Sequence, residues 1–395
     1  MVSEALSGEP GIRAWVETPE PPFAEDWKVR VLERREAQAA PSGLRISPES
    51  KRGLGRFYFG WTLSFLVDEM ALLDKFGRQI TDLRVSVTDR CNFRCVYCRS
   101  ANPENYMAHE DLLDWDEYER LVRILVGLGI QKVRVTGGEP LVRPGVEDFV
   151  ARLKRLGVRD LSMTTNGHLL ASRLNALVEA GLDRINISLD SLDRKKFEKV
   201  TRTESFDAVL AGMDAAQASR LRPVKVNAVL VRGLNDDEVE GFAEFARDRD
   251  LIVRFIEFMP LDGDRAWTRD MVVTAAEIHR RISAHWPLVP IAHERSETAR
   301  KYRFADGRGE IGLIAPVSQP FCGHCSRIRV TADGKLRTCL FSDEDHDLKV
   351  LLRGGADDAE IADQIRAIVM EKEERHHIND PGFVQPSRTM VFIGG

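Results

Sequence analysis

Apolar and polar positions change their period along this chain in a regular way from about residue 70 onward. Short runs of β-branched and apolar residues, typical of buried strands, alternate with longer stretches that have the i, i+3, i+4, i+7 spacing of a helix with one buried face. The runs predict six strands, at residues 83–87, 132–135, 160–164, 184–188, 225–231 and 252–256. The longer stretches predict helices that include residues 118–126, 146–156 and 206–213.

Six successive strand–helix units predict a parallel sheet, which can close as a barrel or stay open. In both cases ligands collect at the carboxyl ends of the strands. After about residue 290 the alternation is lost. Residues 302–330 read as short strands and turns, and helices are expected at 345–352 and 357–370. We expect these later residues to form a second, smaller domain.

Residues 1–69 differ from the rest because Pro, Glu and Arg dominate and apolar periodicity is weak. We therefore assign no stable domain to them. The apolar run at 57–67 is too short for a membrane span, and no secretory signal is visible, so we expect a cytoplasmic protein without membrane attachment. The net charge of −5, from 57 basic and 62 acidic residues, argues against binding of nucleic acid by the whole surface.

The six cysteines fall into two groups of three. The first group is Cys91, Cys95 and Cys98, and the second is Cys322, Cys325 and Cys339. In a chain without an export signal, thiolate metal ligation is a better interpretation than disulfides. Three thiolates leave one ligand position open. A 4Fe–4S cluster would then keep one free iron, whereas a structural zinc site would need a fourth ligand such as His109 or His324.

A polar motif, Thr136-Gly-Gly-Glu-Pro140, closes the second predicted strand. Its two glycines allow close approach of a ligand to the backbone, and Glu139 offers an acceptor for an ammonium group. A turn followed by a helix-starting proline would account for the same residues when they are taken alone.

The C-x3-C-x2-C spacing of the first cysteine group, with Tyr97 before the last cysteine, resembles the signature of the radical S-adenosylmethionine (SAM) superfamily. The resemblance implies that this group holds a 4Fe–4S cluster that cleaves SAM. It also implies a set of SAM-binding residues: Tyr97, Gly138, Glu139, Ser188 and Met259.

Further segments resemble one family within that superfamily, the radical enzymes that cyclise GTP in molybdenum cofactor biosynthesis. The matching segments are Asp74–Arg78, Leu83–Cys91, Thr164–Gly167, Asn186–Leu192, Lys225–Asn227, Arg254–Pro260, Cys322–Leu336 and the terminal Gly394–Gly395. The resemblance covers about residue 70 to the end. It implies a lyase reaction in which a radical joins ribose C3′ to purine C8, giving 3′,8-cyclo-7,8-dihydroguanosine 5′-triphosphate.

The same resemblance assigns roles to single residues. A GTP-binding set is implied: Arg84, Arg134, Thr164, Lys225, Arg254, Arg327, Ile328 and Arg329. The second cysteine group would hold a second 4Fe–4S cluster. Arg327 and Arg329, which alternate on a predicted strand and so share one face, and a flexible tail of Gly394 and Gly395 would act in catalysis.

The resemblance completes the expected fold and domain division. We expect an incomplete (β/α)6 TIM-like barrel at residues 70–290, with a C-terminal cluster-binding domain at 291–395. Residues 1–69 precede the usual start of the family, so we expect an N-terminal extension that is disordered or an artefact of start-codon assignment.

The implied partners are GTP, SAM, an electron-donor protein and the cyclic pyranopterin monophosphate synthase that takes the product. The sequence leaves the oligomeric state open between a monomer and a homodimer. Two rival interpretations are a different radical SAM enzyme with an auxiliary cluster, such as a peptide-modifying one, and a non-catalytic zinc protein.

Overall fold

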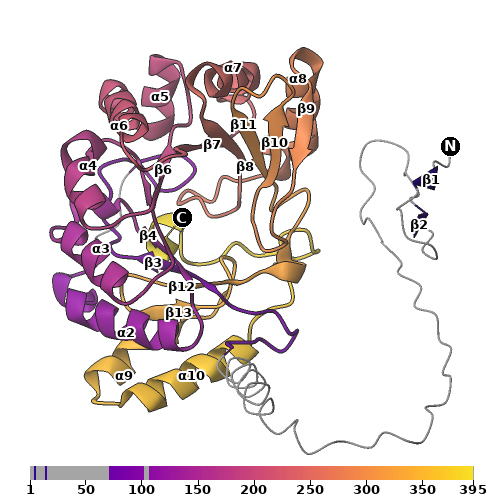
Figure 1. The fold of residues 1–395 in the computed structure, drawn as a ribbon. Helices are drawn as coiled ribbons and strands as arrows, with labels where there is room; N and C mark the ends of the chain where they lie inside the picture. The colour runs from indigo at the N-terminus through magenta and orange to yellow at the C-terminus, as the bar shows by residue number, and fades with distance from the viewer. Residues whose placement is uncertain (1–3, 6–13, 16–70, 102–105, 395) are drawn as a thin grey trace, which may run out of the picture. The chain divides into compact units, whose positions relative to one another are not determined.

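The computed structural model describes residues 4–5, 14–15, 71–101 and 106–394 (Figure 1). The chain divides into two compact units, Met1–Thr62 and Leu63–Gly395. In the first unit the described residues are the strands β1 (Glu4–Ala5) and β2 (Ala14–Trp15), which pair antiparallel. The other residues of the extension expected at 1–69 lie outside the described part of the chain.

All six predicted strands are present in the second unit, each within one or two residues of its expected bounds. They are β3 (Asp82–Ser86), β4 (Lys132–Thr136), β5 (Asp160–Thr165), β6 (Arg184–Ser188), β7 (Lys225–Leu230) and β8 (Ile252–Glu257). Each pairs in parallel with the next, in chain order. The parallel strand–helix series predicted from the apolar pattern is therefore confirmed.

The helices that follow these strands in the chain cover the outer face of the curved sheet (Figure 1). They are α2 (Trp115–Gly127), α3 (Val146–Arg155), α4 (Leu170–Glu179), α5 (Arg194–Thr201), α6 (Phe206–Ala218), α7 (Val239–Arg249) and α8 (Ala275–His285). Helix α2 shows why they form: Asp114 and Glu117 make a reciprocal capping box, and one apolar face, including Tyr118 and Leu121, is fully buried.

Strands from the C-terminal part extend both edges of the six-stranded sheet. Strand β12 (Arg327–Val330) pairs in parallel with β3, and β11 (Glu310–Ile314) pairs in parallel with β8. Antiparallel strands follow on each side. These are β13 (Lys335–Arg337) and β14 (His346–Asp347) beyond β12, and β10 (Arg300–Phe304) and β9 (Leu288–Ile291) beyond β11.

The result is a mixed sheet of twelve strands that does not close, which agrees with the expected incomplete barrel. The strands and turns expected at 302–330 are present. The helix expected at 345–352 begins later, as α9 (Lys349–Arg353), because residues 346–347 pair with β13 instead. Helices α10 (Asp358–Met370) and α11 (Met390–Ile393) complete the fold.

None of the helices in the described ranges is long and apolar enough to cross a lipid bilayer.

Candidate functional site

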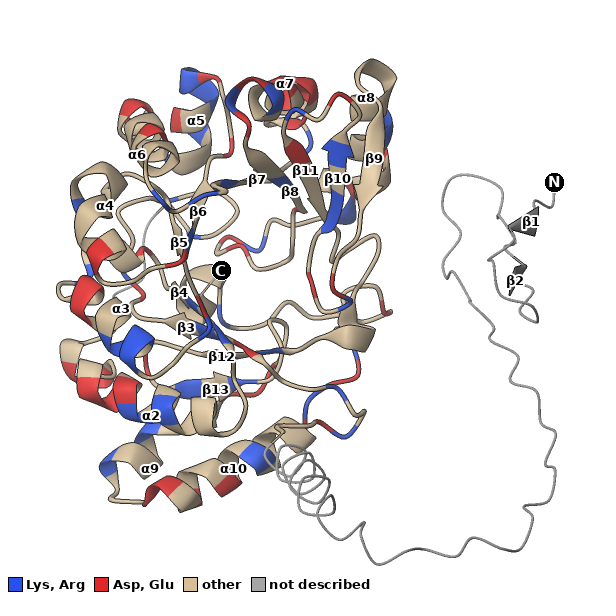
Figure 2. Cartoon of the chain, viewed as in Figure 1, with Lys and Arg blue, Asp and Glu red and all other residues tan. Residues whose placement is uncertain are grey.

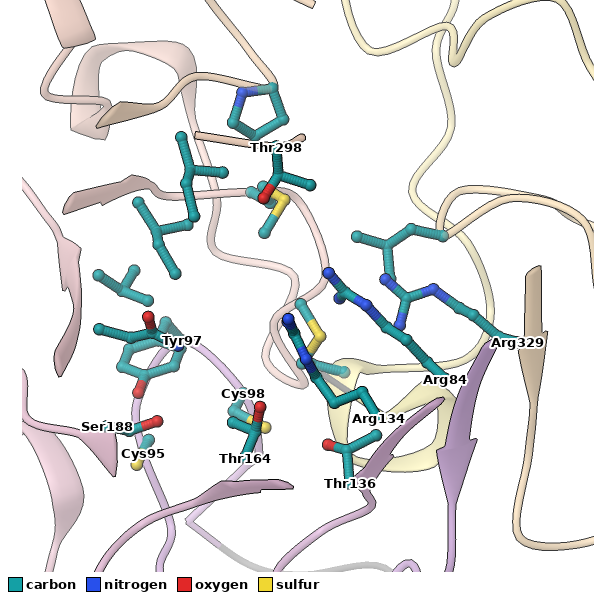
Figure 3. Close-up of a pocket in the computed structure, with 18 of the residues that line it drawn as sticks. Arg84, Cys95, Tyr97, Cys98, Arg134, Thr136, Thr164, Ser188, Thr298 and Arg329 are labelled. Atoms are coloured by element: carbon teal, nitrogen blue, oxygen red, sulfur yellow. The ribbon is translucent and has the colours of Figure 1, made fainter. Parts of the chain in front are cut away.

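Both cysteine groups line one cavity of about 280 Å³ at the carboxyl ends of the parallel strands. Strand-end residues such as Thr136, Thr164 and Ser188 form part of its wall. Figure 3 shows side chains from the cysteine loop on one side of this space and the arginines of β3, β4 and β12 on the other. Segments more than 200 residues apart in the sequence therefore share one site.

The first cysteine group lies in the loop between β3 and α2. The main-chain N–H groups of Cys98 and Arg99 both donate to the Cys95 carbonyl, at 2.9 and 3.0 Å, so the loop forms a tight turn. Burial, with a smaller contribution from Glu139, raises the pKa of the Cys91 thiol to about 11, and burial and Cys91 raise that of Cys98 to about 12. These thiols would become thiolates only next to a cation, which fits a metal cluster as their partner.

The Gly-Gly-Glu motif packs directly against this loop. A Cβ atom on Gly138 would lie 2.3 Å from the Arg90 carbonyl oxygen, so only glycine fits there. The Glu139 carboxylate accepts hydrogen bonds from the main-chain N–H of Leu141 (3.0 Å) and Asn166 (2.7 Å), and from the Thr165 hydroxyl (2.8 Å). Burial raises the pKa of Glu139 to about 7. The motif thus presents a buried acceptor beside the first cysteine group.

Asp190 is a cavity residue that the sequence analysis did not single out. Its carboxylate accepts from the Tyr97 hydroxyl at 2.6 Å and from the Val229 N–H at 2.9 Å, and burial raises its pKa to about 6. Its position two residues after Ser188, just beyond the end of β6, was the signal available in the sequence. The hydrogen bond between Tyr97 and Asp190 holds the Tyr97 ring toward the end of β6.

Arginines form a row across the sheet on the cavity side. The register places Arg84 of β3 opposite Arg329 of β12 and opposite Arg134 of β4, so the three side chains lie on one face. Their guanidinium groups converge in Figure 3, and Figure 2 shows the basic segments crossing β3, β4 and β12 while acidic segments are frequent on outer helices such as α2 and α7. Arg254 of β8 and Arg327 of β12 also line the cavity.

These cations are poorly compensated within the protein. Burial and neighbouring arginines lower the pKa of Arg84 and bring that of Arg134 to about 10 and of Arg254 to about 9. Arg254 donates to the neutral amides of Asn227 (2.8 Å) and Asn186 (2.7 Å). Arg84 makes no hydrogen bond or ion pair with any described residue. Because like charges held together are unfavourable, the row is arranged for an anionic ligand.

The second cysteine group lines the same cavity near Arg329, since Cys339 and Cys325 are among the groups that act on its charge. Cys322 opens a short 3-10 turn, Cys322–His324, and Cys339 follows β13. Burial raises the pKa of Cys339 to about 11. At Cys325, Arg327 and Lys372 outweigh burial and lower the pKa of the thiol.

A single zinc ion fits this arrangement poorly. Among the described residues, three ligand atoms within 4.8 Å of one another are found at Glu344, His346 and Glu371, and not at either cysteine triad. Ligands of one tetrahedral zinc ion at ~2.3 Å from sulfur would lie closer than that. The two triads, each with its cysteines half-buried around a shared cavity, fit larger clusters.

The C-terminal tail reaches the arginine row. The guanidinium of Arg329 donates to the Gly394 carbonyl. Gly394 has φ +82°, and a Cβ atom there would lie 2.9 Å from side-chain carbons of Ser86 and Thr136, so the position requires glycine. Gly395 lies outside the described residues.

Most of the residues that the sequence predicted for the site line this cavity. The exceptions among described residues are Lys225, Ile328 and Gly394. Lys225 is nevertheless close to the arginine row, since burial and Arg254 lower its pKa to about 7. Ile328 alternates with the two arginines of β12, so its side chain is fully buried in the apolar core instead of facing the cavity. Its membership of the GTP-binding set stays a prediction, in which Ile328 would contact a ligand through its main chain.

An open parallel barrel with three cysteines after its first strand and a Gly-Gly-Glu motif after its second defines a radical SAM enzyme. Residues 85–246 match the model of the Radical SAM superfamily, and residues 251–378 match the model described as Molybdenum Cofactor Synthesis C. The chain belongs to the GTP 3′,8-cyclase family: it is 49% identical to the GTP 3′,8-cyclase of Mycobacterium sp. (strain KMS), over 82% of this chain and 93% of the relative.

Other similarities agree with this membership. The GTP 3′,8-cyclase of Thermodesulfovibrio yellowstonii is 43% identical, over 82% of this chain and 99% of the relative. Streptococcus suis SuiB bound to precursor peptide SuiA has a similar fold, with a TM-score of 0.53 at 14% identity over 80% of this chain and 76% of that one. Membership of the radical SAM superfamily implies a 4Fe–4S cluster and SAM as cofactors.

Proposed function

We propose that this protein converts GTP to 3′,8-cyclo-7,8-dihydroguanosine 5′-triphosphate in molybdenum cofactor biosynthesis. The observation that carries the proposal is the row of arginines that shares one cavity with two cysteine triads. A triphosphate carries about four negative charges, and guanidinium forks suit phosphate oxygens best. The row supplies the charge that such an anion requires.

The first cysteine group and its neighbours form the SAM end of the site. Cys91, Cys95 and Cys98 would hold the 4Fe–4S cluster, which together with SAM supplies a 5′-deoxyadenosyl radical when both are bound. Glu139 has the charge and burial to accept hydrogen bonds from the methionyl ammonium, and Gly138 keeps the backbone open beside it. Tyr97, Ser188 and Met259 line the same cavity and complete this end.

The arginine row and its neighbours form the GTP end. Arg84, Arg134 and Arg329 would bind phosphate oxygens, together with Arg254 and Arg327. The buried hydroxyl of Thr164 has no hydrogen-bond partner among the described residues, which supports a ligand contact there. Lys225 would add charge from behind the cavity wall.

We propose that Cys322, Cys325 and Cys339 hold a second 4Fe–4S cluster whose open position faces the purine. The position of this triad in the same cavity as the arginines supports the assignment. The Gly394 carbonyl on Arg329 supports a tail that orders the arginine row around bound GTP.

The proposed domains are a partial barrel at residues 70–290 and a cluster-binding domain at 291–395. An external protein would deliver electrons to the first cluster, and a synthase that forms cyclic pyranopterin monophosphate would consume the product. Either a monomer or a homodimer fits one complete cavity in each chain.

The test is anaerobic reconstitution followed by incubation with GTP, SAM and dithionite. Eight irons and eight sulfides per chain are expected, with formation of 5′-deoxyadenosine and a nucleotide that has the same mass as GTP but a different retention time. The cyclisation is an isomerisation, so chromatography and not mass identifies the product. A protein that cleaves SAM in the presence of GTP but leaves all GTP unchanged would contradict the proposal.

A further inference from the structure

Lys372, just after α10, is one of the largest fully buried side chains in the described part of the protein, with 2% of its surface exposed. Its ammonium group donates to two main-chain carbonyls, those of Arg327 at 3.0 Å and of Thr338. Arg327 follows Cys325 by two residues, and Thr338 immediately precedes Cys339. The lysine therefore lies behind the loops that carry the second cysteine group.

Among the described residues no carboxylate forms an ion pair with this lysine, and the adjacent Glu373 interacts with it only at longer range. Many surface lysines, by contrast, have an ion-pair partner. The adjacent carboxylate, Glu373, accepts instead from the Thr338 hydroxyl at 2.8 Å. Carbonyl dipoles only partly offset the cost of burying a cation, which is several kcal/mol in a protein interior. A buried anion near the two carbonyls would offset the rest of this free-energy cost.

The cysteine thiols are the groups that can become that anion. Lys372 holds the carbonyl that immediately precedes Cys339 and the carbonyl two residues after Cys325, so its charge lies next to the main chain that carries these two thiols. Arg327 and Arg78 lie in the same region, but both have other partners. Arg327 donates to the Ser296 carbonyl at 2.7 Å, and Arg78 forms an ion pair with Asp74. Lys372 differs from both, because it is fully buried whereas Arg327 is half-buried, and unlike Arg78 it has no carboxylate partner among the described residues.

We propose that Lys372 is the fixed counter-charge of the second cluster and sets its reduction potential. The inference rests on the proposed function, which assigns a 4Fe–4S cluster to Cys322, Cys325 and Cys339. Three thiolates make such a centre net negative, and one-electron reduction adds a further negative charge. A buried cation stabilises the reduced state more than the oxidised state and so raises the potential. Lys372 acts through the cluster and does not touch substrate, so it is a positioning residue.

The test removes the charge while keeping hydrogen-bond donors at the two carbonyls. Lys372→Gln is placed in a full-length chain whose first triad is replaced by serine, so that only the second cluster is present. Dithionite titration with redox mediators, followed by electron paramagnetic resonance, gives the potential. We expect the ratio of reduced to oxidised cluster to fall about ten-fold at a fixed potential, which is a shift of ~59 mV to lower values. Lys372→Arg, which retains the charge, should stay close to the parent.

A matched control is Lys349→Gln, because Lys349 also donates to a main-chain carbonyl, that of Asp111 at 2.9 Å, but is not among the charges that act on the second cysteine group. It should leave the potential unchanged. An unchanged potential in Lys372→Gln would overturn the inference and leave the lysine a purely structural role. Lys372→Gln could also fail to hold the second cluster. In that case, iron and sulfide retained in Lys372→Arg would support a role for the positive charge, whereas their loss in both variants would overturn the inference.

The iron content separates this inference from the proposed function. Suppose that the parent chain with all six cysteines holds four irons, and that the chain without the first triad holds none. This result would show that the second triad binds no cluster, and it would contradict this part of the proposed function. A second cluster that is present, but whose potential does not respond to Lys372→Gln, would defeat the inference alone.

Discussion

Replacement of Arg134 by methionine should make the ligand-free protein more stable and its GTP binding weaker. Methionine fills similar space without the charge. Burial and the nearby Arg184 bring the pKa of Arg134 to about 10, at least two pH units below the ordinary range for arginine. At ~1.36 kcal/mol for each pH unit, keeping this side chain charged at pH 7 costs the fold about 3 kcal/mol.

The sign follows from the direction of the pKa change. Because the folded-state pKa lies below the unfolded-state value, folding disfavours the charged form at every pH below about 10, and this cost disappears only as the pH rises above that value. The neutral side chain avoids the cost at pH 7. Screening by cavity water and the loss of a 3.3 Å hydrogen bond to Ser162 reduce the expected gain to about 1–2 kcal/mol.

Urea unfolding of the ligand-free variant measures the first effect, and equilibrium binding of labelled GTP measures the second. A lost charged phosphate contact costs ~1.5–3 kcal/mol, so GTP affinity should fall roughly ten- to a hundred-fold while SAM affinity is unchanged. The control is Arg281→Met on α8, since Arg281 forms an ion pair with Glu240 away from the cavity and its loss should not stabilise the protein. The reasoning is refuted if Arg134→Met destabilises the protein as Arg281→Met does, or if it binds GTP normally.

Three further predictions concern the two clusters, the tail and the SAM end. Cys91→Ser should abolish reductive SAM cleavage, whereas Cys322→Ser should leave some cleavage and end GTP conversion; equal loss of 5′-deoxyadenosine in both variants would contradict the separate roles. Deletion of Gly394 and Gly395 should change GTP affinity little and reduce product formation by more than ten-fold, and normal turnover would show that the tail has no catalytic part. SAM binding, measured by equilibrium dialysis, should weaken as the pH falls through about 7, because Glu139 becomes protonated and loses its attraction for the methionyl ammonium. Glu139→Gln should bind SAM about ten-fold more weakly with no such pH dependence, and a pH profile like that of the parent protein would assign the titration to another group.

The apolar pattern predicted the partial barrel well because each strand has a buried apolar face and each helix buries one apolar face in return. Strands such as β6 have the bounds that the sequence indicated. Local pattern could not predict that β12 pairs with β3, since this pairing joins residues more than 240 positions apart. The cysteine triads and the alternation of Arg327 and Arg329 were readable because they depend only on spacing.

Other features of the site were not readable from local sequence. The alternation that brings two arginines of β12 into the cavity turns Ile328 into the core, and a family resemblance that includes all three residues does not separate them. Asp190 and Lys372 went unnoticed because each becomes distinctive only through burial and through partners far away in the chain, Tyr97 in one case and the Arg327 and Thr338 carbonyls in the other. Sequence spacing carries no record of such contacts.

The sheet topology has a consequence for synthesis of the protein on the ribosome. The six central strands are complete once residue 257 has emerged, but their two edges are covered only by β11 and β12, which end at residues 314 and 330. Until then β3 and β8 present unpaired backbone groups that can add a strand from another chain. The nascent protein therefore passes through a stage in which its central strands are all made and both ends of its sheet are open to aggregation. Synthesis of residues 310–339 ends that exposure and also supplies the second cysteine triad.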